Sequence, residues 1–322
     1  MARQAETSEQ RRERRITAWG LSFTWLLIIG GTQAVVAVIA ILALIGSAVA
    51  RSGQSILSNQ SYLSQTLVQR YLGMMGWILI ASDIATVLIF LFIVKSRHES
   101  FRQTVGLRRF RPLLIVALLM MGGGLSLLLN CGEQIIAALL PTATSSSSMT
   151  DLAFGQLFST IPGILSIVVV APIAEEIMFR GMVFGTLNKK LAFPVALIMQ
   201  AVFFGVFHGN IPQGLMTFGL GILLAWVYLR SGSLFSSMLI HFAFNGTTTL
   251  IILVTGYAGT GPLLMWVLLM VVAIGLFASG LIWQIFQTRQ KRPGLERGLE
   301  PAPTSAPPVF ASGDEPPSML VS

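Results

Sequence analysis

The sequence predicts an all-α, polytopic membrane protein with about eight transmembrane helices, and three observations carry that prediction. The 322 residues are 54% hydrophobic and only 11% charged, with a mean hydropathy of +0.76, whereas a typical soluble domain is about 25% charged. The apolar residues form long blocks, most of them near the roughly 20 residues that a helix needs to cross a bilayer. Lysines and arginines gather in every second loop between these blocks.

Eight apolar segments define the expected helices. The first is long enough to tilt or to extend beyond the bilayer, and the last five follow one another closely. The segments are 19–49, 72–94, 113–140, 161–187, 191–208, 213–229, 233–254 and 262–287. They predict one membrane domain over 19–288, with a basic N-terminal tail at 1–18. The tail at 289–322 is rich in Pro and small residues and is predicted to be disordered.

The positive charges predict the orientation of the chain. Five arginines precede the first segment, six lysines and arginines occupy the loop 95–112, and the loop 141–160 has none. Because positively charged loops stay on the cytoplasmic side, both termini are expected there. The net charge of +8 is concentrated next to apolar segments, which favours membrane lipid as a partner and argues against nucleic acid. The oligomeric state does not follow from these features.

Three ionisable residues interrupt the fourth segment, although each charge at the bilayer centre costs about 2.5–3.5 kcal/mol. Glu176 and Arg180 are four residues apart and share a helix face, so they are expected to form an ion pair. Glu175 is rotated away and lacks that partner. A buried carboxylate without a cation is a stronger base than one in water, which suits a general base acting on water. Pro172, one turn earlier, is expected to kink the helix and open space near the acids.

Two of the three histidines also lie in predicted spans. His208 ends the fifth segment, and His241 lies on the seventh with Asn245 one turn later. Glu175 with His208 could hold and deprotonate a water, while His241 and Asn245 could donate hydrogen bonds to an oxyanion. This set predicts amide hydrolysis without a serine or cysteine nucleophile. The segment boundaries, however, place His208 near an outer helix end and the glutamates nearer the middle.

A metal ion is the second route to the same chemistry. Glu175, His208 and His241 could bind Zn²⁺ with water as the fourth ligand, but the H-E-x-x-H spacing of zinc proteases is absent. The sequence therefore favours no cofactor and leaves a divalent metal open.

Further polar and small residues at membrane depth have structural interpretations. Asp83 and Glu133 are expected to meet a polar neighbour or a wet cavity, and neither they nor Asn130 has an assigned role. Glycines in the third and sixth segments are expected to permit close helix packing; these are Gly122, Gly123, Gly124, Gly214, Gly219 and Gly221.

Three short motifs resemble those of one known family. "EEIMFRG" is similar to the E-E-x-x-x-R motif of the CPBP family, which comprises CAAX proteases and bacteriocin-processing or immunity proteins and is also called Abi or Rce1-like. "FGVFH", beginning at Phe204, is similar to its F-x-x-x-H motif, and "HFAFN", beginning at His241, to its H-x-x-x-N motif. The motifs occur in the family's order, and the resemblance covers about residues 155–255.

The resemblance implies an Rce1-like bundle of eight helices that acts as an intramembrane endopeptidase of the glutamate or metal-dependent type. By it, Glu175 and His208 would activate water, and His241 with Asn245 would form the oxyanion site. Glu176, Arg180 and Phe204 would be supporting residues. The implied substrate is a membrane-associated peptide or protein, prenylated in the CAAX-processing members.

Two other functions stay open at this point. A non-catalytic bacteriocin self-immunity or partner-binding protein could use the same cavity, and a Glu175→Gln variant would then keep the phenotype. A transporter using the buried acids would show pH-driven flux in liposomes, although the paired broken helices of many transporters are missing from the sequence.

Overall fold

A computed structural model describes residues 7–52, 60–139, 153, 155–255 and 261–289, and the elements in these ranges are helices without a strand. The predicted tail at 289–322 lies outside the described residues except for Arg289, which ends the last helix. The elements are α1 (Ser8–Ser52), α2 (Gln60–Ser96), α3 (Phe101–Thr104), α4 (Leu114–Leu139), α6 (Ile161–Leu165), η3 (Ser166–Val170), α7 (Ala171–Glu175), η4 (Glu176–Phe184), α8 (Gly185–Lys190), α9 (Phe193–Phe207), α10 (Ile211–Ser231), α11 (Leu234–Thr255) and α12 (Leu263–Arg289).

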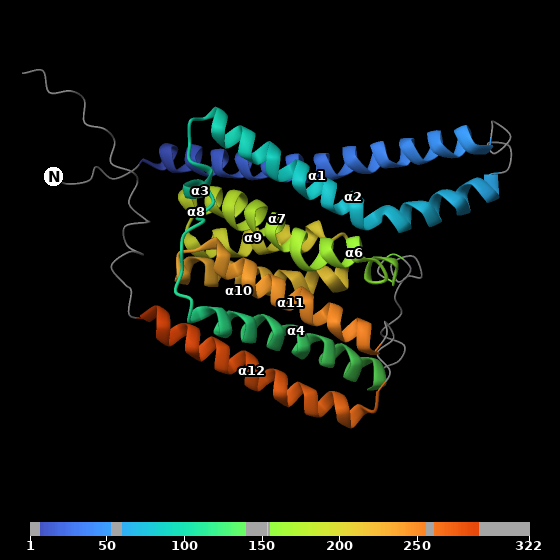
Figure 1. The fold of residues 1–322 in the computed structure, drawn as a ribbon. Coiled ribbons are helices and arrows are strands. Elements are labelled where there is room, and N and C mark those ends of the chain that lie inside the picture. Colours follow the sequence, from blue (N-terminus) through green and yellow to red (C-terminus); the bar gives the residue numbers. More distant parts are fainter. Residues whose placement is uncertain (1–6, 53–59, 140–152, 154, 256–260, 290–322) are drawn as a thin grey trace, which may run out of the picture.

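The helices form a bundle with two outer pairs and a central group (Figure 1). The long hairpin α1–α2 makes one edge, and α4 packs against α12 at the opposite edge. Between them run the continuous helical stretch from α6 to α8 and the helices α9, α10 and α11. The stretch from α6 to α8 contacts both α2 and α11, so side chains from several spans can meet around it.

The all-α, polytopic prediction is confirmed, because seven helices in the described ranges are long and apolar enough to cross a membrane. The chain is therefore an integral, multi-pass membrane protein. α1 starts at Ser8, so residues 8–18 of the predicted tail are already helical. Which side of the membrane holds the termini stays a prediction from the positive charges.

The fifth predicted segment is the one that differs, because α9 has only 15 residues. At about 1.5 Å per residue it is roughly 22 Å long, shorter than the hydrocarbon layer of about 30 Å. Pro194 lies in its first turn. Past its end, Gly209 has a φ of +73°, and Asn210 caps α10 by accepting a hydrogen bond from the Gln213 N–H at 2.9 Å. Apolar composition predicted this helix, whereas turn chemistry set its length.

The short α9 also removes the expected difference in depth between the acids and His208. Glu175 lies 15 residues before Lys190, the end of α8, and His208 lies 15 residues after Phe193, the start of α9. Since a tight connection joins α8 to α9, both residues lie roughly 22 Å from the same side of the bundle. The sequence instead predicts a membrane-spanning helix that begins two residues earlier, at 191.

Close helix contacts rely on glycine, as expected for most of the glycines named from the sequence. A Cβ added at Gly122 would collide with the Ile240 carbonyl on α11, and one at Gly124 would lie 2.6 Å from the Phe277 nitrogen on α12. Gly214 and Gly221 likewise face α9 at close range, whereas a Cβ at Gly219 would meet nothing within 4 Å. Without a hydrophobic force between helices in lipid, such contacts hold the bundle together through packing.

Gly122→Ala is expected to lower the free energy of unfolding by about 1–3 kcal/mol, because the new methyl overpacks the α4–α11 contact. Gly275→Ala on α12 is the matched control, since a Cβ there meets nothing within 4 Å. The control should be neutral or stabilising by up to about 1 kcal/mol. Unfolding of both variants in detergent micelles measures the difference, and equal effects at the two positions would contradict this account of the packing.

Candidate active site

The helix that carries the two glutamates is wider than an ordinary α-helix on both sides of them. The π-helical segments η3 and η4 flank the short α7, which contains Pro172 and ends at Glu175. Proline cannot donate a backbone hydrogen bond and clashes with the preceding turn, and wide turns are one way for a helix to absorb it. The disturbance expected at Pro172 therefore takes the form of π-helical turns, which re-aim the side chains that follow.

Glu176 and Arg180 form the ion pair that their spacing predicts. The distance from Arg180 Nη1 to Glu176 Oε1 is 2.9 Å, and both side chains are fully buried. The guanidinium also lies over the ring of Phe204 at 4.3 Å, which adds a cation–π attraction in a dry environment. Arg180 Nε and Nη2 have no hydrogen-bond partner among the described residues. Glu176 and the Phe204 ring therefore supply the main interactions that offset the cost of burying the guanidinium.

His241 stands between the two glutamates. Its Nδ1 lies 3.0 Å from Glu176 Oε1, and its Nε2 lies 3.7 Å from Glu175 Oε2. Because a carboxylate only accepts, the Nδ1 atom carries the proton in this hydrogen bond. Glu176 therefore fixes the ring so that Nε2 faces Glu175. The Glu175 side chain is 14% exposed, in contrast to the fully buried Glu176.

His208 is held by the helix that it terminates. Its Nδ1 lies 2.8 Å from the Phe204 carbonyl oxygen, so Nδ1 donates and Nε2 keeps its lone pair. The imidazole packs edge-on against Phe204, with ring centroids 4.9 Å apart, and His241 packs edge-on against the same ring at 5.9 Å. The two imidazoles therefore lie on one aromatic side chain, which places them within about 11 Å of each other.

Asn245 lies one turn after His241 on α11 and points at the widened helix. Its Nδ2 donates to the Ile167 carbonyl in η3 at 2.8 Å. A side-chain amide has two N–H groups, so one donor is left after this bond. The α11 helix thus presents His241 and Asn245 to the same neighbouring helix, at two successive levels.

Most of the candidate site residues named from the sequence lie together in the structure, but their contacts differ from the predicted ones. The sequence analysis pairs Glu175 with His208, yet the imidazole within ion-pair distance of Glu175 is that of His241. The reason is that Glu176 orients His241 toward Glu175, while the Phe204 carbonyl holds one side of His208. The set as a whole meets the minimum requirement for shared chemistry, since Glu175 lies well within about 10 Å of one imidazole, the range of one or two bridging waters.

Asp83 lies near this site, although the sequence analysis assigns it no role. It is 4% exposed on α2, which packs against α7, and its carboxyl interacts electrostatically with Glu175. An acid within an apolar segment already suggests that Asp83 has a polar neighbour. A single sequence, however, does not show which spans face each other. Of the other two unassigned residues, Asn130 donates to the Ser126 carbonyl and to Thr248, and Glu133 is exposed on α4.

The three side chains named as possible zinc ligands have separate partners in this arrangement. No group of three His, Cys, Asp or Glu side chains in the described part of the chain is placed to hold a metal ion. His241 Nδ1 is engaged by Glu176, and His208 Nδ1 by a backbone carbonyl. A divalent metal at these residues stays a prediction from the sequence, and the steps proposed below are written with protein side chains and water.

Comparisons with known proteins support the family suggested by the motifs. Residues 157–247 match the profile of the family described as type II CAAX prenyl endopeptidase Rce1-like, and this range contains all three motifs. The chain is 32% identical over 77 residues to "Putative membrane peptidase YdiL" of Bacillus subtilis (strain 168) and 31% identical over 110 residues to "UPF0177 protein YxdF" of Lactococcus lactis subsp. lactis (strain IL1403).

These matches are partial. The alignments cover 24% and 33% of this chain, and 32% and 58% of the respective relatives. No solved structure matches the chain significantly. The agreement between three motifs, the family profile and two bacterial relatives confirms the resemblance seen in the sequence: residues 157–247 of this chain are similar to the Rce1-like, or CPBP, family.

Proposed function

We propose that this protein is an intramembrane endopeptidase that hydrolyses a peptide bond of a membrane-associated substrate with a water activated by Glu175. The observation that carries the proposal is the ordered contact from Arg180 through Glu176 and His241 to Glu175. A fully buried ion pair orients an imidazole, and the imidazole faces a carboxylate that retains some exposure. Preorganised groups of this kind can serve water activation and charge stabilisation at a single carbonyl.

In the proposed first step, Glu175 accepts a proton as the oxygen of water bonds to the scissile carbonyl carbon. The carbonyl π electrons move to the oxygen, and a tetrahedral oxyanion forms. His208, whose Nε2 keeps a lone pair, assists in holding the water. This assignment rests on the hydrogen bond from His208 Nδ1 to the Phe204 carbonyl, which leaves Nε2 as an acceptor.

The oxyanion is proposed to lie against His241 and Asn245. Asn245 offers the N–H that its bond to Ile167 leaves over, and His241 donates from Nε2 when that atom is protonated. The intermediate then collapses as the carbon–nitrogen bond breaks. The proton held by Glu175 passes to the leaving amine, which returns the carboxylate to its starting state and yields a carboxylic acid and a free amine.

The family description supports a substrate of the CAAX type, and the depth of Glu175 gives a physical reason for a membrane anchor. A soluble peptide would have to leave water to reach a carboxylate roughly 22 Å from the end of its helix. A peptide with a lipid or an apolar helix is already in the layer that surrounds the site.

The test is cleavage by the full chain in phosphatidylcholine vesicles. A farnesylated peptide with a C-terminal CaaX sequence should lose its last three residues, detected by mass spectrometry, with ¹⁸O from labelled water in the new carboxylate. The same peptide without the lipid should be cut at less than about a tenth of the rate. A glutamate-type mechanism predicts that o-phenanthroline changes neither rate. Activity lost to the chelator and restored by Zn²⁺ would replace this mechanism by a metal-dependent one, and no cleavage of either peptide would refute the proposed substrate class.

A further inference from the structure

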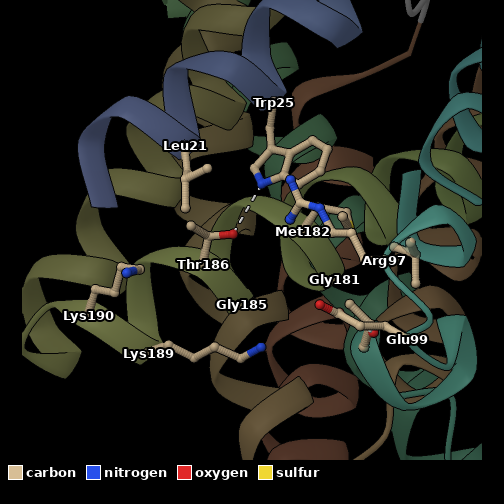
Figure 2. Close-up of a pocket in the computed structure, with 12 residues that line it drawn as sticks. Leu21, Trp25, Arg97, Glu99, Gly181, Met182, Gly185, Thr186, Lys189 and Lys190 are labelled. Carbon is tan, nitrogen blue, oxygen red and sulfur yellow. Dashed lines mark hydrogen bonds between the residues drawn. The ribbon is translucent and has the colours of Figure 1, made fainter. Parts of the chain in front are cut away.

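A cavity of about 190 Å³ lies outside the candidate active site, between α1, the end of α2 and the α8 end of the widened helix (Figure 2). None of the residues proposed for catalysis lines it. Its lining includes Trp25 from α1, Arg97 after α2, and Lys189 and Lys190 at the end of α8. A water molecule needs only about 10–15 Å³ of such space, so the cavity accommodates a considerably larger group.

The cavity lies where the membrane surface is expected. Lys189 and Lys190 end one apolar helix, and Arg97 directly follows another. Trp25 lies near the beginning of the apolar part of α1. Tryptophan together with lysine and arginine is typical of the boundary between the hydrocarbon layer and water. Phe23 and Leu27, next to Trp25 along α1, are 53% and 74% exposed and would face acyl chains.

The lining carries an excess of positive charge that the described part of the protein does not neutralise. Arg97, Lys189 and Lys190 make no ion pair with a described residue, and the one acid in the lining, Glu99, accepts a hydrogen bond from Thr104 at 3.3 Å. With three cations and one carboxylate, the cavity has a formal charge of +2 at neutral pH.

Contacts among the lining side chains hold part of the cavity in place. The Trp25 indole N–H donates to the Thr186 hydroxyl at 3.1 Å, and the Arg97 guanidinium lies 5.9 Å from the Trp25 ring. Figure 2 shows these side chains reaching the cavity from separate elements. Arg97 is thus placed by a cation–π contact while its N–H groups stay available to an anion.

We propose that this cavity binds the headgroup of an anionic phospholipid, with the phosphodiester among Arg97, Lys189 and Lys190. A basic pocket between transmembrane helices, at the end expected to face the cytoplasm, is suited to such a headgroup. An anionic lipid fits both the positive charge of the lining and the apolar residues beside it. Its phosphate would bind the cations, and its acyl chains would lie along the exposed apolar surface of α1. The bound headgroup would connect the α1–α2 hairpin to the helix that carries Glu175.

The proposal is tested by native mass spectrometry of the full chain in detergent, with phosphatidylglycerol, phosphatidylcholine or inorganic phosphate added. Phosphatidylglycerol should bind in preference to phosphatidylcholine. Lys189→Gln/Lys190→Gln should weaken phosphatidylglycerol binding about tenfold to thirtyfold, since each cation near a phosphate layer contributes substantially. Arg108→Gln/Arg109→Gln is the matched control, because it removes the same charge from the part of the loop 95–112 that does not line the cavity. This variant should stay within about twofold of the wild type.

A second variant tests the cavity itself without a change of charge. A Cβ at Gly185, which lines the cavity, would meet only the Arg180 carbonyl oxygen at 3.9 Å, so Gly185→Leu should fill the space and abolish phosphatidylglycerol binding with little loss of thermal stability. Equal losses in the two double variants would mean that surface charge alone attracts the lipid and would overturn the site. Displacement of the lipid by millimolar inorganic phosphate would overturn the lipid as its ligand.

Discussion

Glu175→Gln is expected to lower kcat/KM for cleavage of a membrane-anchored peptide by at least about a thousandfold, within the range that loss of a general base produces. Glutamine keeps the shape of the side chain and its hydrogen bonding but cannot accept the proton of water. Glu175 is partly exposed and is not part of the buried ion pair, so the variant should fold normally. The measurement is the initial rate in vesicles, with thermal unfolding as the check on folding.

Glu133→Gln is the matched control for this experiment. It removes an acid from another membrane helix, at an exposed position on α4, and should leave the rate within about twofold of the wild type. Cleavage by Glu175→Gln at the wild-type rate would remove Glu175 from the mechanism. If the variant also keeps the protein's cellular phenotype, a non-catalytic immunity or partner-binding protein explains the chain better. Proton flux in protein-containing liposomes would favour a transporter instead.

Arg180→Met is expected to cost about 3–5 kcal/mol of folding free energy, because it leaves the Glu176 carboxylate buried without its cation. His241, at 3.0 Å, then remains as a hydrogen-bond partner of that carboxylate. Methionine fills similar space, so the loss reflects charge rather than a cavity. Unfolding in mixed micelles of a mild detergent and increasing SDS measures the change, and cleavage activity should fall with it because His241 loses its anchor.

Two further variants separate the ion pair from simple loss of an arginine. Arg109→Met removes an exposed arginine and should change stability by no more than about 0.5 kcal/mol. Glu176→Gln combined with Arg180→Met removes both charges, so it should recover part of the stability lost in Arg180→Met. If Arg180→Met lowers the folding free energy by less than about 1 kcal/mol, Arg180 does not stabilise the buried Glu176 carboxylate as the geometry indicates. Additive effects of the two substitutions in the double variant would lead to the same conclusion.

The two predictions assign different tasks to adjacent glutamates. Glu176 is fully buried, paired with Arg180 and bonded to His241, so its proposed task is to position. Glu175 makes no direct ion pair with a described lysine or arginine, it is partly exposed, and it faces Nε2 of His241. Its proposed task is therefore chemical. Stability measurements should respond mainly to the first residue, and kcat mainly to the second.

Much of this arrangement could be predicted from residue types and spacing. Glu176 and Arg180 had to share a face because they are four residues apart, and the cost of charge in lipid made their pairing a strong expectation. Helices at all eight apolar segments followed from composition. Asp83 could not be placed near Glu175, because facing between distant spans depends on how each helix is rotated, and apolar segments exposed to lipid on one side carry a weak signal of that rotation.

The sequence by itself determined that this is a multi-pass, all-α membrane protein with a conspicuous set of polar residues on its fourth, fifth and seventh segments, since backbone polar groups and charges in lipid leave few alternatives. Only the tertiary structure decided that α9 is short enough to bring His208 to the depth of Glu175, that His241 is the imidazole near Glu175, and that residues of α1, α2 and α8 line a basic cavity. The physical reason is that residues far away in the chain determine the π-helical turns, the rotation of each helix and the glycine-mediated contacts. Hydropathy and motif spacing depend only on residues that are close in the sequence.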